Sequence, residues 1–143
     1  MAQKLLIIIV SILFVTIIAI PCAKCQWIPT NFYGGAHSFV VSGQNLFAGS
    51  QGVFRSSDNG KNWTVANSNS LNAEVISLAL IDTDLFAGTA NQGVFLSTNN
   101  GRNWTAVNTG LPMNTAVSAL IAIGSSLFAG TDQNGVFSRQ IRA

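Results

Sequence analysis

The stretch LFAGTANQGVFLSTNNGRNW, residues 85–104, decides the fold because the chain repeats it. A closely similar copy, LFAGSQGVFRSSDNGKNW, occupies residues 46–63. A third copy begins as LFAGTDQNGVFSRQ at residues 127–140. The copies are spaced by about 41 residues, which lies within the period of a repeated four-stranded β unit. The sequence therefore predicts a repeat architecture.

Each repeat unit divides into short strand-like runs separated by turn residues, which indicates an all-β fold. The first run is rich in Val, Ile and Leu and nearly continuous, as expected for a strand covered on both faces. These first runs are residues 38–42, 76–81 and 119–123. The LFAG element forms the second strand, and its small Ala-Gly pair should let adjacent units approach closely.

The third strand opens with Gly-Val-Phe, at residues 52–54, 93–95 and 135–137, and the fourth strand starts at each tryptophan. Four short antiparallel strands at this spacing are typical of a β-propeller blade. We therefore predict an all-β chain of propeller-type four-stranded blades.

Two turns between the third and fourth strands read SSDNGKNW and STNNGRNW. They resemble the Asp-box, or BNR repeat, with the pattern S-x-D-x-G-x-[TN]-W. A short polar side chain caps such a turn, Gly takes a positive φ angle, and Trp buries a large apolar surface. Both tryptophans are predicted to be buried fold anchors without a part in binding. The residues interpreted as structural are Ser56, Asp58, Gly60, Trp63, Ser97, Asn99, Gly101 and Trp104.

The resemblance covers most of residues 38–140 and implies a sialidase-like or photosystem-II-assembly-factor-like propeller. Sialidases use an arginine triad, a Tyr nucleophile backed by Glu, and an Asp acid. This chain has one Tyr, Tyr33, one Glu, Glu74, and no clamp-like arrangement of its arginines. No serine nucleophile elbow, phosphate loop or metal-ligand cluster is present in the sequence. We therefore expect no catalysis and no cofactor.

Charge excludes another class of partner. Charged residues make up 8% of the chain, and the formal net charge is +2. From Gln26 onward the arginines and lysine are balanced by the acidic residues. The sequence therefore lacks the basic surface that binding to a nucleic-acid backbone requires.

The N-terminal segment, residues 1–25, has the layout of a secretory signal peptide. A positive start precedes an apolar run over residues 5–20, and small residues follow Pro21. Both cysteines, Cys22 and Cys25, fall in this segment, where we interpret them as part of a discarded peptide. The prediction is a secreted, periplasmic or cell-surface domain over residues 26–143; an uncleaved membrane anchor is the alternative.

Residues 26–143 hold two complete units and a third that lacks its turn and fourth strand. The sequence WIPTN, residues 27–31, echoes WTAVN, residues 104–108, and is predicted to supply the missing strand. Three blades are fewer than the four to eight of typical closed rings. The alternatives are a homodimer of six blades, in which each N-terminal strand completes the partner's last blade, a fragment of a longer propeller, and an open three-blade stack.

Loops between second and third strands share one face with the loops that enter each first strand. Side-chain amides there could hydrogen-bond a sugar or a polar peptide, although solvated hairpin loops are the simpler interpretation. The predicted function is a non-catalytic secreted or cell-surface binding or scaffold module with a glycan or protein ligand. The alternatives are a degenerate or partial glycan-processing propeller and a fragment of a larger propeller protein. The candidate ligand-binding residues are Tyr33, Gln51, Asn91, Gln92, Asp132, Gln133 and Asn134.

Overall fold

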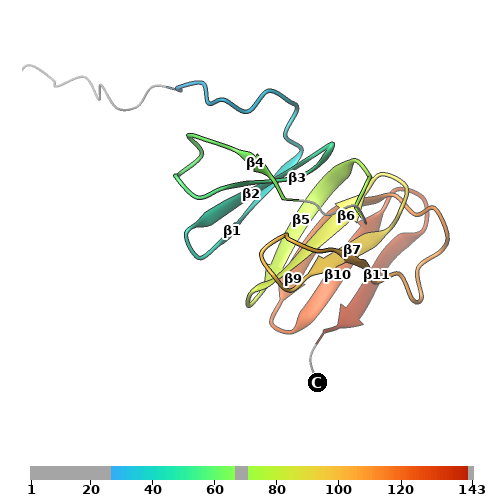
Figure 1. Ribbon diagram of the computed structural model, residues 1–143. Coiled ribbons are helices and arrows are strands. Elements are labelled where there is room, and N and C mark those ends of the chain that lie inside the picture. The colour runs from blue at the N-terminus through green and yellow to red at the C-terminus, as the bar shows by residue number, and fades with distance from the viewer. Residues whose placement is uncertain (1–26, 67–70, 142–143) are drawn as a thin grey trace, which may run out of the picture.

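The computed structural model describes residues 27–66 and 71–141, and all regular secondary structure in these ranges is β-strand. The strands form three antiparallel sheets that lie side by side (Figure 1). The first unit comprises β1 (Ser38–Ser42), β2 (Asn45–Ser50), β3 (Gly52–Ser56) and β4 (Thr64–Val65). The second comprises β5 (Val75–Ile81), β6 (Asp84–Thr89), β7 (Val94–Ser97) and β8 (Thr105–Ala106). The third comprises β9 (Val117–Ile123), β10 (Ser126–Thr131) and β11 (Gly135–Gln140).

Strand order within each sheet follows chain order, so the predicted all-β fold is confirmed. The same register recurs, because Phe47, Phe86 and Phe128 of the LFAG strands lie opposite Val40, Ala79 and Ile121. The first strand of each unit contacts the first strand of the next, which places β1, β5 and β9 on the inner side of the array. No helix within the described ranges is long and apolar enough to cross a membrane.

Two hydrophobic cores fill the spaces between sheets. Leu85 belongs to the core between the first and second units, and its neighbour Phe86 belongs to the core between the second and third. Consecutive strand residues point to opposite faces, so the middle sheet is covered on both sides. The expectation of two covered faces holds for β5 but is wrong for β1 and β9, which lie in the two end sheets. Phe39 and Val41 are 56% and 60% exposed, and Ile121 and Ile123 are 60% and 63% exposed.

The small residues of the LFAG strands set how closely the sheets approach. A methyl group added at Gly88 would lie 2.7 Å from the carbonyl oxygen of Val117, in the third unit. One added at Gly49 would lie 2.9 Å from the carbonyl oxygen of Val75, in the second unit. Backbone atoms cannot yield as a flexible side chain can, so glycine is required at both positions. The predicted close approach of adjacent units is confirmed.

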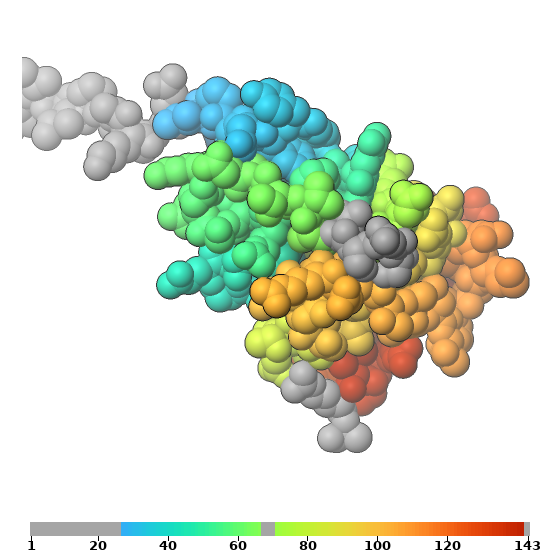
Figure 2. Space-filling view, in the orientation of Figure 1, coloured from blue at the N-terminus to red at the C-terminus, as the bar shows by residue number. Residues whose placement is uncertain are grey.

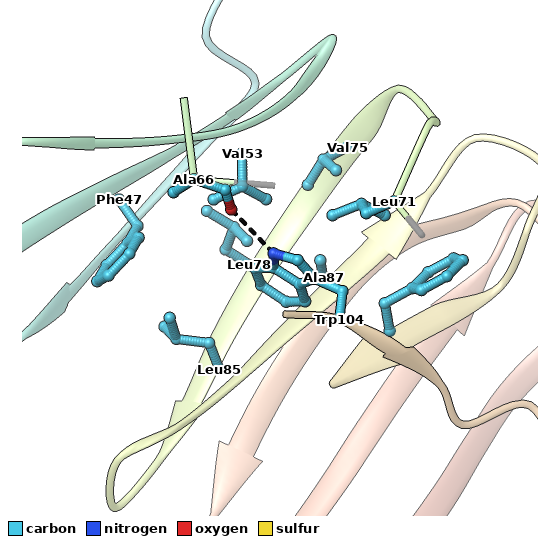
Figure 3. Close-up of a cluster of buried hydrophobic side chains, with 10 residues drawn as sticks. Phe47, Val53, Ala66, Leu71, Val75, Leu78, Leu85, Ala87 and Trp104 are labelled. Carbon is cyan, nitrogen blue, oxygen red and sulfur yellow. Dashed lines mark hydrogen bonds between the residues drawn. The ribbon is translucent and has the colours of Figure 1, made fainter. Parts of the chain in front are cut away.

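The tryptophans of the first two units differ in burial. Trp104 is 3% exposed and reaches across into the first unit, where its Nε1 donates to the Ala66 carbonyl at 2.9 Å (Figure 3). Trp63 is half-buried and its Nε1 donates to the Gly60 carbonyl within its own turn at 3.0 Å. The prediction that both are buried anchors is therefore wrong for Trp63. Among the described residues no sheet precedes the first unit to cover it.

The N-terminal segment, residues 27–37, lies beside the first unit (Figure 2). Asn31 Nδ2 donates to the side-chain oxygen of Asn62 at 2.9 Å, which holds the segment against the turn before β4. Residues 27–31 form no strand within the single chain, and the third sheet has three strands over the described ranges. The predicted completion of the third unit by this segment is therefore not formed inside one chain.

Candidate functional site

A cleft of about 410 Å³ opens beside the first unit, between the N-terminal segment and the β2–β3 turn. Elements from three parts of the chain meet there: the segment before β1, the first sheet, and the residue before β5. The residues that line the cleft are Asn31, Phe32, Tyr33, Gly34, Gly35, His37, Ser50, Gln51, Phe54, Trp63 and Glu74.

Aromatic rings form one wall of the cleft. The Phe32 ring packs edge-on against Phe54, with ring centroids 5.1 Å apart, and against Trp63 at 5.3 Å. The Phe39 ring also lies near Trp63, with ring centroids 6.2 Å apart and the planes tilted. Such edge-to-face contacts hold the rings in fixed relative orientations. The Tyr33 ring is 97% exposed at the rim, where it presents a free aromatic surface.

Polar side chains also line the cleft. His37 Nε2 lies 3.1 Å from Glu74 Oε1, and both side chains are about half exposed. The two residues stand immediately before β1 and β5, so the neighbouring first strands bring them together. Ser50 is buried at the end of β2, and the exposed Gln51 follows it in the turn. The rim therefore presents an amide, an imidazole–carboxylate pair and backbone groups.

The structure brings some of the predicted ligand-binding residues together and separates others. Tyr33 and Gln51 both line the cleft. Asn91 and Gln92 are exposed on the second unit, where the Gln92 side chain donates to the Asn72 carbonyl at 3.2 Å. The remaining predicted residues, Asp132, Gln133 and Asn134, are exposed in the β10–β11 turn and do not line the cleft.

The prediction missed His37 and Glu74, as well as the aromatic wall. A signal was present, because each of these two residues directly precedes a first strand of its unit. First strands of adjacent units are neighbours, so residues at their entrances can lie close together even though His37 and Glu74 are not equivalent positions in the strand register. The aromatic wall has no local signal, because Phe32 reaches Phe54 and Trp63 from a segment without regular structure.

The two polar turns have the hydrogen bonds expected of them. Ser56 Oγ accepts a bond from the Gly60 amide at 2.9 Å, and Ser97 Oγ accepts one from Gly101 at the same distance. Gly60 and Gly101 have φ angles of 82° and 79°, which favour glycine. In the first turn Asp58 Oδ1 accepts from the Asn62 amide at 2.8 Å. Asn99 Oδ1 accepts the matching bond from Asn103, also at 2.8 Å.

The first turn also shifts the titration of its carboxylate. Hydrogen bonds from the Asn62 backbone and side chain, and one from Ser56, lower the pKa of Asp58 from 3.8 to about 2. Hydrogen-bond donors that favour the ionised form of a carboxylate stabilise the folded state as long as the pH is high enough to keep the carboxylate ionised. The second turn has neutral Asn99 in place of Asp58, so it keeps the backbone bonds without this dependence on pH.

Antiparallel sheets repeated at one spacing, with their first strands on the inner side and their cores between them, define a β-propeller. The repeated LFAG register and the turn before each fourth strand place this chain in that class. The chain belongs to the DUF6242 β-propeller domain family, whose model matches residues 31–137.

Solved propellers share this fold. YCF48 from Cyanidioschyzon merolae has a TM-score of 0.61 and 14% identity, over 81% of this chain and 37% of that one. The extracellular domain of a putative hybrid two-component system from B. thetaiotaomicron has a TM-score of 0.62 and 20% identity, over 79% of this chain and 16% of that one. The GH74 enzyme of Niastella koreensis has a TM-score of 0.57 and 19% identity, over 73% and 19%.

These identities establish likeness of fold alone. The chain spans 37% of the length of the YCF48 chain and less of the other two. No curated protein matches the sequence.

Proposed function

We propose that this chain is a non-catalytic binding module, with the cleft beside the first unit as its ligand site and a neutral glycan as its ligand. The observation that carries the proposal is that an exposed aromatic ring, Tyr33, and an exposed amide, Gln51, line the same cleft. Aromatic rings stack on the apolar faces of sugars, while amides and hydroxyls exchange hydrogen bonds with sugar hydroxyls. Sites of this kind combine an apolar lining with a few placed polar groups.

The charge of the cleft supports a neutral ligand. Glu74 is the one carboxylate among the cleft-lining residues, and its charge faces His37 at 3.1 Å. Lysine and arginine are absent from that lining, so a phosphate or carboxylate group on a ligand would have no formal cation other than a protonated His37 to meet.

The same carboxylate argues against glycoside hydrolysis. Glycosidases generally place two carboxyl groups on opposite sides of the bond that they cleave. The lining of this cleft supplies Glu74 and no second acidic side chain. The likeness to the GH74 enzyme is a likeness of fold. A degenerate glycan-processing propeller, which would bind a glycan without cleaving it, is the second candidate.

A peptide ligand is the competing assignment within the binding role. One solved structure is of YCF48 bound to a D1 peptide, with a TM-score of 0.62 to this chain. A peptide commonly adds a strand to a free sheet edge. The cleft is instead lined by side chains and turns, which favours a sugar.

Two further inferences complete the proposed role. The polar turns are Asp-box turns with a structural part, which their shared serine, glycine and tryptophan contacts support. The module is exported to the periplasm, the cell surface or the medium, which the layout of residues 1–25 supports. That segment lies outside the described residues.

A glycan array probed with the purified full chain tests the proposal. Tyr33→Ala and Gln51→Ala should each weaken binding to the best glycan about 10-fold or more, because each removes one hydrogen-bonding or stacking group. Gln44→Ala, an exposed amide in the β1–β2 turn outside the cleft, is the matched control. Binding to a peptide array without binding to the glycan array would show that the ligand is a peptide and not a glycan. Release of fluorophore from a fluorogenic sialoside or another glycoside would refute the non-catalytic role.

A further inference from the structure

A second, apolar cavity of about 100 Å³ lies between the second and third units. Five of its lining residues repeat residues that share a core with Trp104 between the first two units. Around the cavity these residues are Val94, Val107, Leu127, Ala129 and Phe137. Their counterparts in the Trp104 core are Val53, Ala66, Leu85, Ala87 and Phe95. The cavity therefore occupies the place of a third tryptophan.

The hydrogen-bond acceptor for that tryptophan is also in place. Trp104 Nε1 donates to the Ala66 carbonyl at 2.9 Å. Val107 holds the equivalent position in the second unit, directly after β8. Its carbonyl accepts a bond from Nη1 of the exposed Arg139 at 3.0 Å. The exposed Arg139 side chain thus contacts the Val107 carbonyl, whose counterpart in the first unit, the Ala66 carbonyl, accepts the bond from the Trp104 indole.

The strand that would carry this tryptophan has an open edge to pair with. In the second unit Phe95 and Leu96 of β7 pair with Ala106 and Thr105 of β8. The equivalent strand, β11, has β10 on one side and no strand on the other over the described ranges. An unpaired edge strand is a template for a further strand.

The N-terminal segment has the features of the missing piece. Trp27 is 98% exposed and Ile28 is 79% exposed, in the sequence WIPTN that echoes WTAVN. Counted to the equivalent residues Val40, Ala79 and Ile121, Trp27 lies 13 positions ahead, Trp63 lies 16 ahead and Trp104 lies 17 ahead, so the first linker is three to four residues shorter. The segment therefore has the layout of a fourth strand and linker that belong to a unit ahead of the first.

Contacts of the segment agree with this placement. Phe32 packs on Phe54 and Trp63, and Leu71 belongs to the same core as the equivalent residues Phe95 and Trp104. The segment already packs on the first unit, as Leu71 ahead of the second unit packs with Phe95 and Trp104. The third sheet of a second copy would therefore need only to pair its edge strand, β11, with residues 27–31.

We propose that the cavity receives Trp27 of a second copy of this chain, and that residues 27–31 of each copy pair with β11 of the other in a closed ring. Two copies of three units give six, the one multiple of three within the four to eight units of typical closed propellers. Head-to-tail contacts of this kind form a ring when the rotation closes.

The exposed apolar residues of the end sheets fit the same assembly. Phe39 and Val41 of β1 repeat Leu78 and Leu80, which pack on the first unit. On the far end sheet, the exposed Ile123 and Val136 repeat Ile81 and Val94, which pack on the third unit. The two outer faces are thus the two halves of the interface that already joins units within the chain.

The ring would also complete the proposed ligand site, a consequence that rests on the proposed function. Within the chain the Gly93 amide donates to the Thr115 carbonyl, which ties a β6–β7 turn to the linker of the next unit. Gly135 repeats Gly93, and Gly34, which lines the cleft, repeats Thr115 in the register that aligns Val40 with Ile121. The partner's β10–β11 turn, with Asp132 and Asn134, would therefore lie beside Tyr33 at the cleft.

Light scattering on the purified full chain tests the assembly. The expected mass is twice that of one chain. Trp27→Ala should weaken the dimer at least about 30-fold at each joint, since central tryptophans are typical interface hot spots. Met113→Ala, which removes a 91% exposed side chain that does not line the cavity, should leave the dimer intact. A monomeric full chain, or a dimer unchanged by Trp27→Ala, would overturn the proposal.

A mixing experiment identifies the cavity as the receiving site. Ala129→Leu fills the cavity, so this variant should be monomeric with an intact Trp27. Trp27→Ala leaves the cavity intact, so an equimolar mixture should form a heterodimer through one joint, while neither variant dimerises alone. If the two folded monomeric variants form no heterodimer when mixed, the cavity is not the site that receives Trp27. If Ala129→Leu fails to fold by circular dichroism, Val107→Phe replaces it.

Failure of this proposal is distinguishable from failure of the proposed function. The scattering and mixing experiments need no ligand. On the glycan array, Asp132→Ala should weaken binding by the dimer and leave binding by a Trp27→Ala monomer unchanged. If Asp132→Ala changes glycan binding in neither the dimer nor the monomer, the partner's β10–β11 turn is not part of the ligand site. That result would leave the proposal of a dimeric ring intact.

Discussion

Trp104 offers the sharpest test of how the units hold together. Its side chain is 3% exposed, and its Nε1 bonds to the carbonyls of Ala66 at 2.9 Å and Gly101 at 3.1 Å (Figure 3). Truncation to alanine removes about 150 Å² of buried apolar surface, which corresponds to about 4 kcal/mol at about 25 cal/mol per Å². We therefore expect Trp104→Ala to lower the free energy of unfolding by about 3–5 kcal/mol.

A phenylalanine at the same position separates packing from hydrogen bonding. Trp104→Phe keeps most of the apolar contact but leaves the Ala66 carbonyl, in a buried residue, without its indole donor. An acceptor left unsatisfied in this way costs about 1–3 kcal/mol. Trp104→Phe should therefore lie between the wild type and Trp104→Ala in stability.

Trp63 is the matched control, since it occupies the same position one unit earlier. Its side chain is partly exposed, so Trp63→Ala should cost about 2–3 kcal/mol, less than the transfer term of the fully buried Trp104. Urea unfolding followed by far-ultraviolet circular dichroism measures all three variants, in a Trp27→Ala background that removes any contribution from assembly. Equal losses at the two tryptophans, or a loss below about 1 kcal/mol for Trp104→Ala, would refute the reasoning.

Further predictions concern the turns and the sheet spacing. Because the pKa of Asp58 is lowered from 3.8 to about 2, its stabilisation should be full above pH 3.8 and vanish as pH falls to about 2. The stability difference between wild type and Asp58→Asn should shrink across that window in acid-titrated urea unfolding; a constant difference contradicts the assignment. Ser97→Ala removes a 1% exposed acceptor of the Gly101 amide and should cost about 1–3 kcal/mol by thermal unfolding; a change within about 0.5 kcal/mol would show that the turn closes without it. Gly88→Ala should destabilise by about 1–3 kcal/mol through contact with the Val117 carbonyl, whereas Gly35→Ala meets nothing within 4 Å and should be near neutral; comparable losses would argue against the close approach.

The strands of the repeat could be predicted from the sequence because their signals are local. Turn residues bound each run, and the predicted first strand at 38–42 coincides with β1. The predicted fourth strands after Trp63 and Trp104 are present as β4 and β8. Tight turns, alternation and small residues act within a few positions, so a single sequence contains their pattern.

Burial of particular side chains could not be predicted in the same way. Trp63 and Trp104 stand in nearly identical sequences, yet one is half-buried and the other is buried. The difference arises from which sheet lies next to each unit, and that depends on contacts far along the chain. The same holds for the cleft, where Tyr33 and Gln51 were predicted but the aromatic wall around Phe32 was not.

The bond from Trp104 to Ala66 also sets an order of events during synthesis. Its partners are 38 residues apart, so the core of the first unit lacks its indole until the second unit has left the ribosome. At about 5–20 residues per second that delay is roughly 2–8 s. The first unit therefore gains its buried indole only after the second unit has been made, and its apolar face stays uncovered by that side chain during the interval.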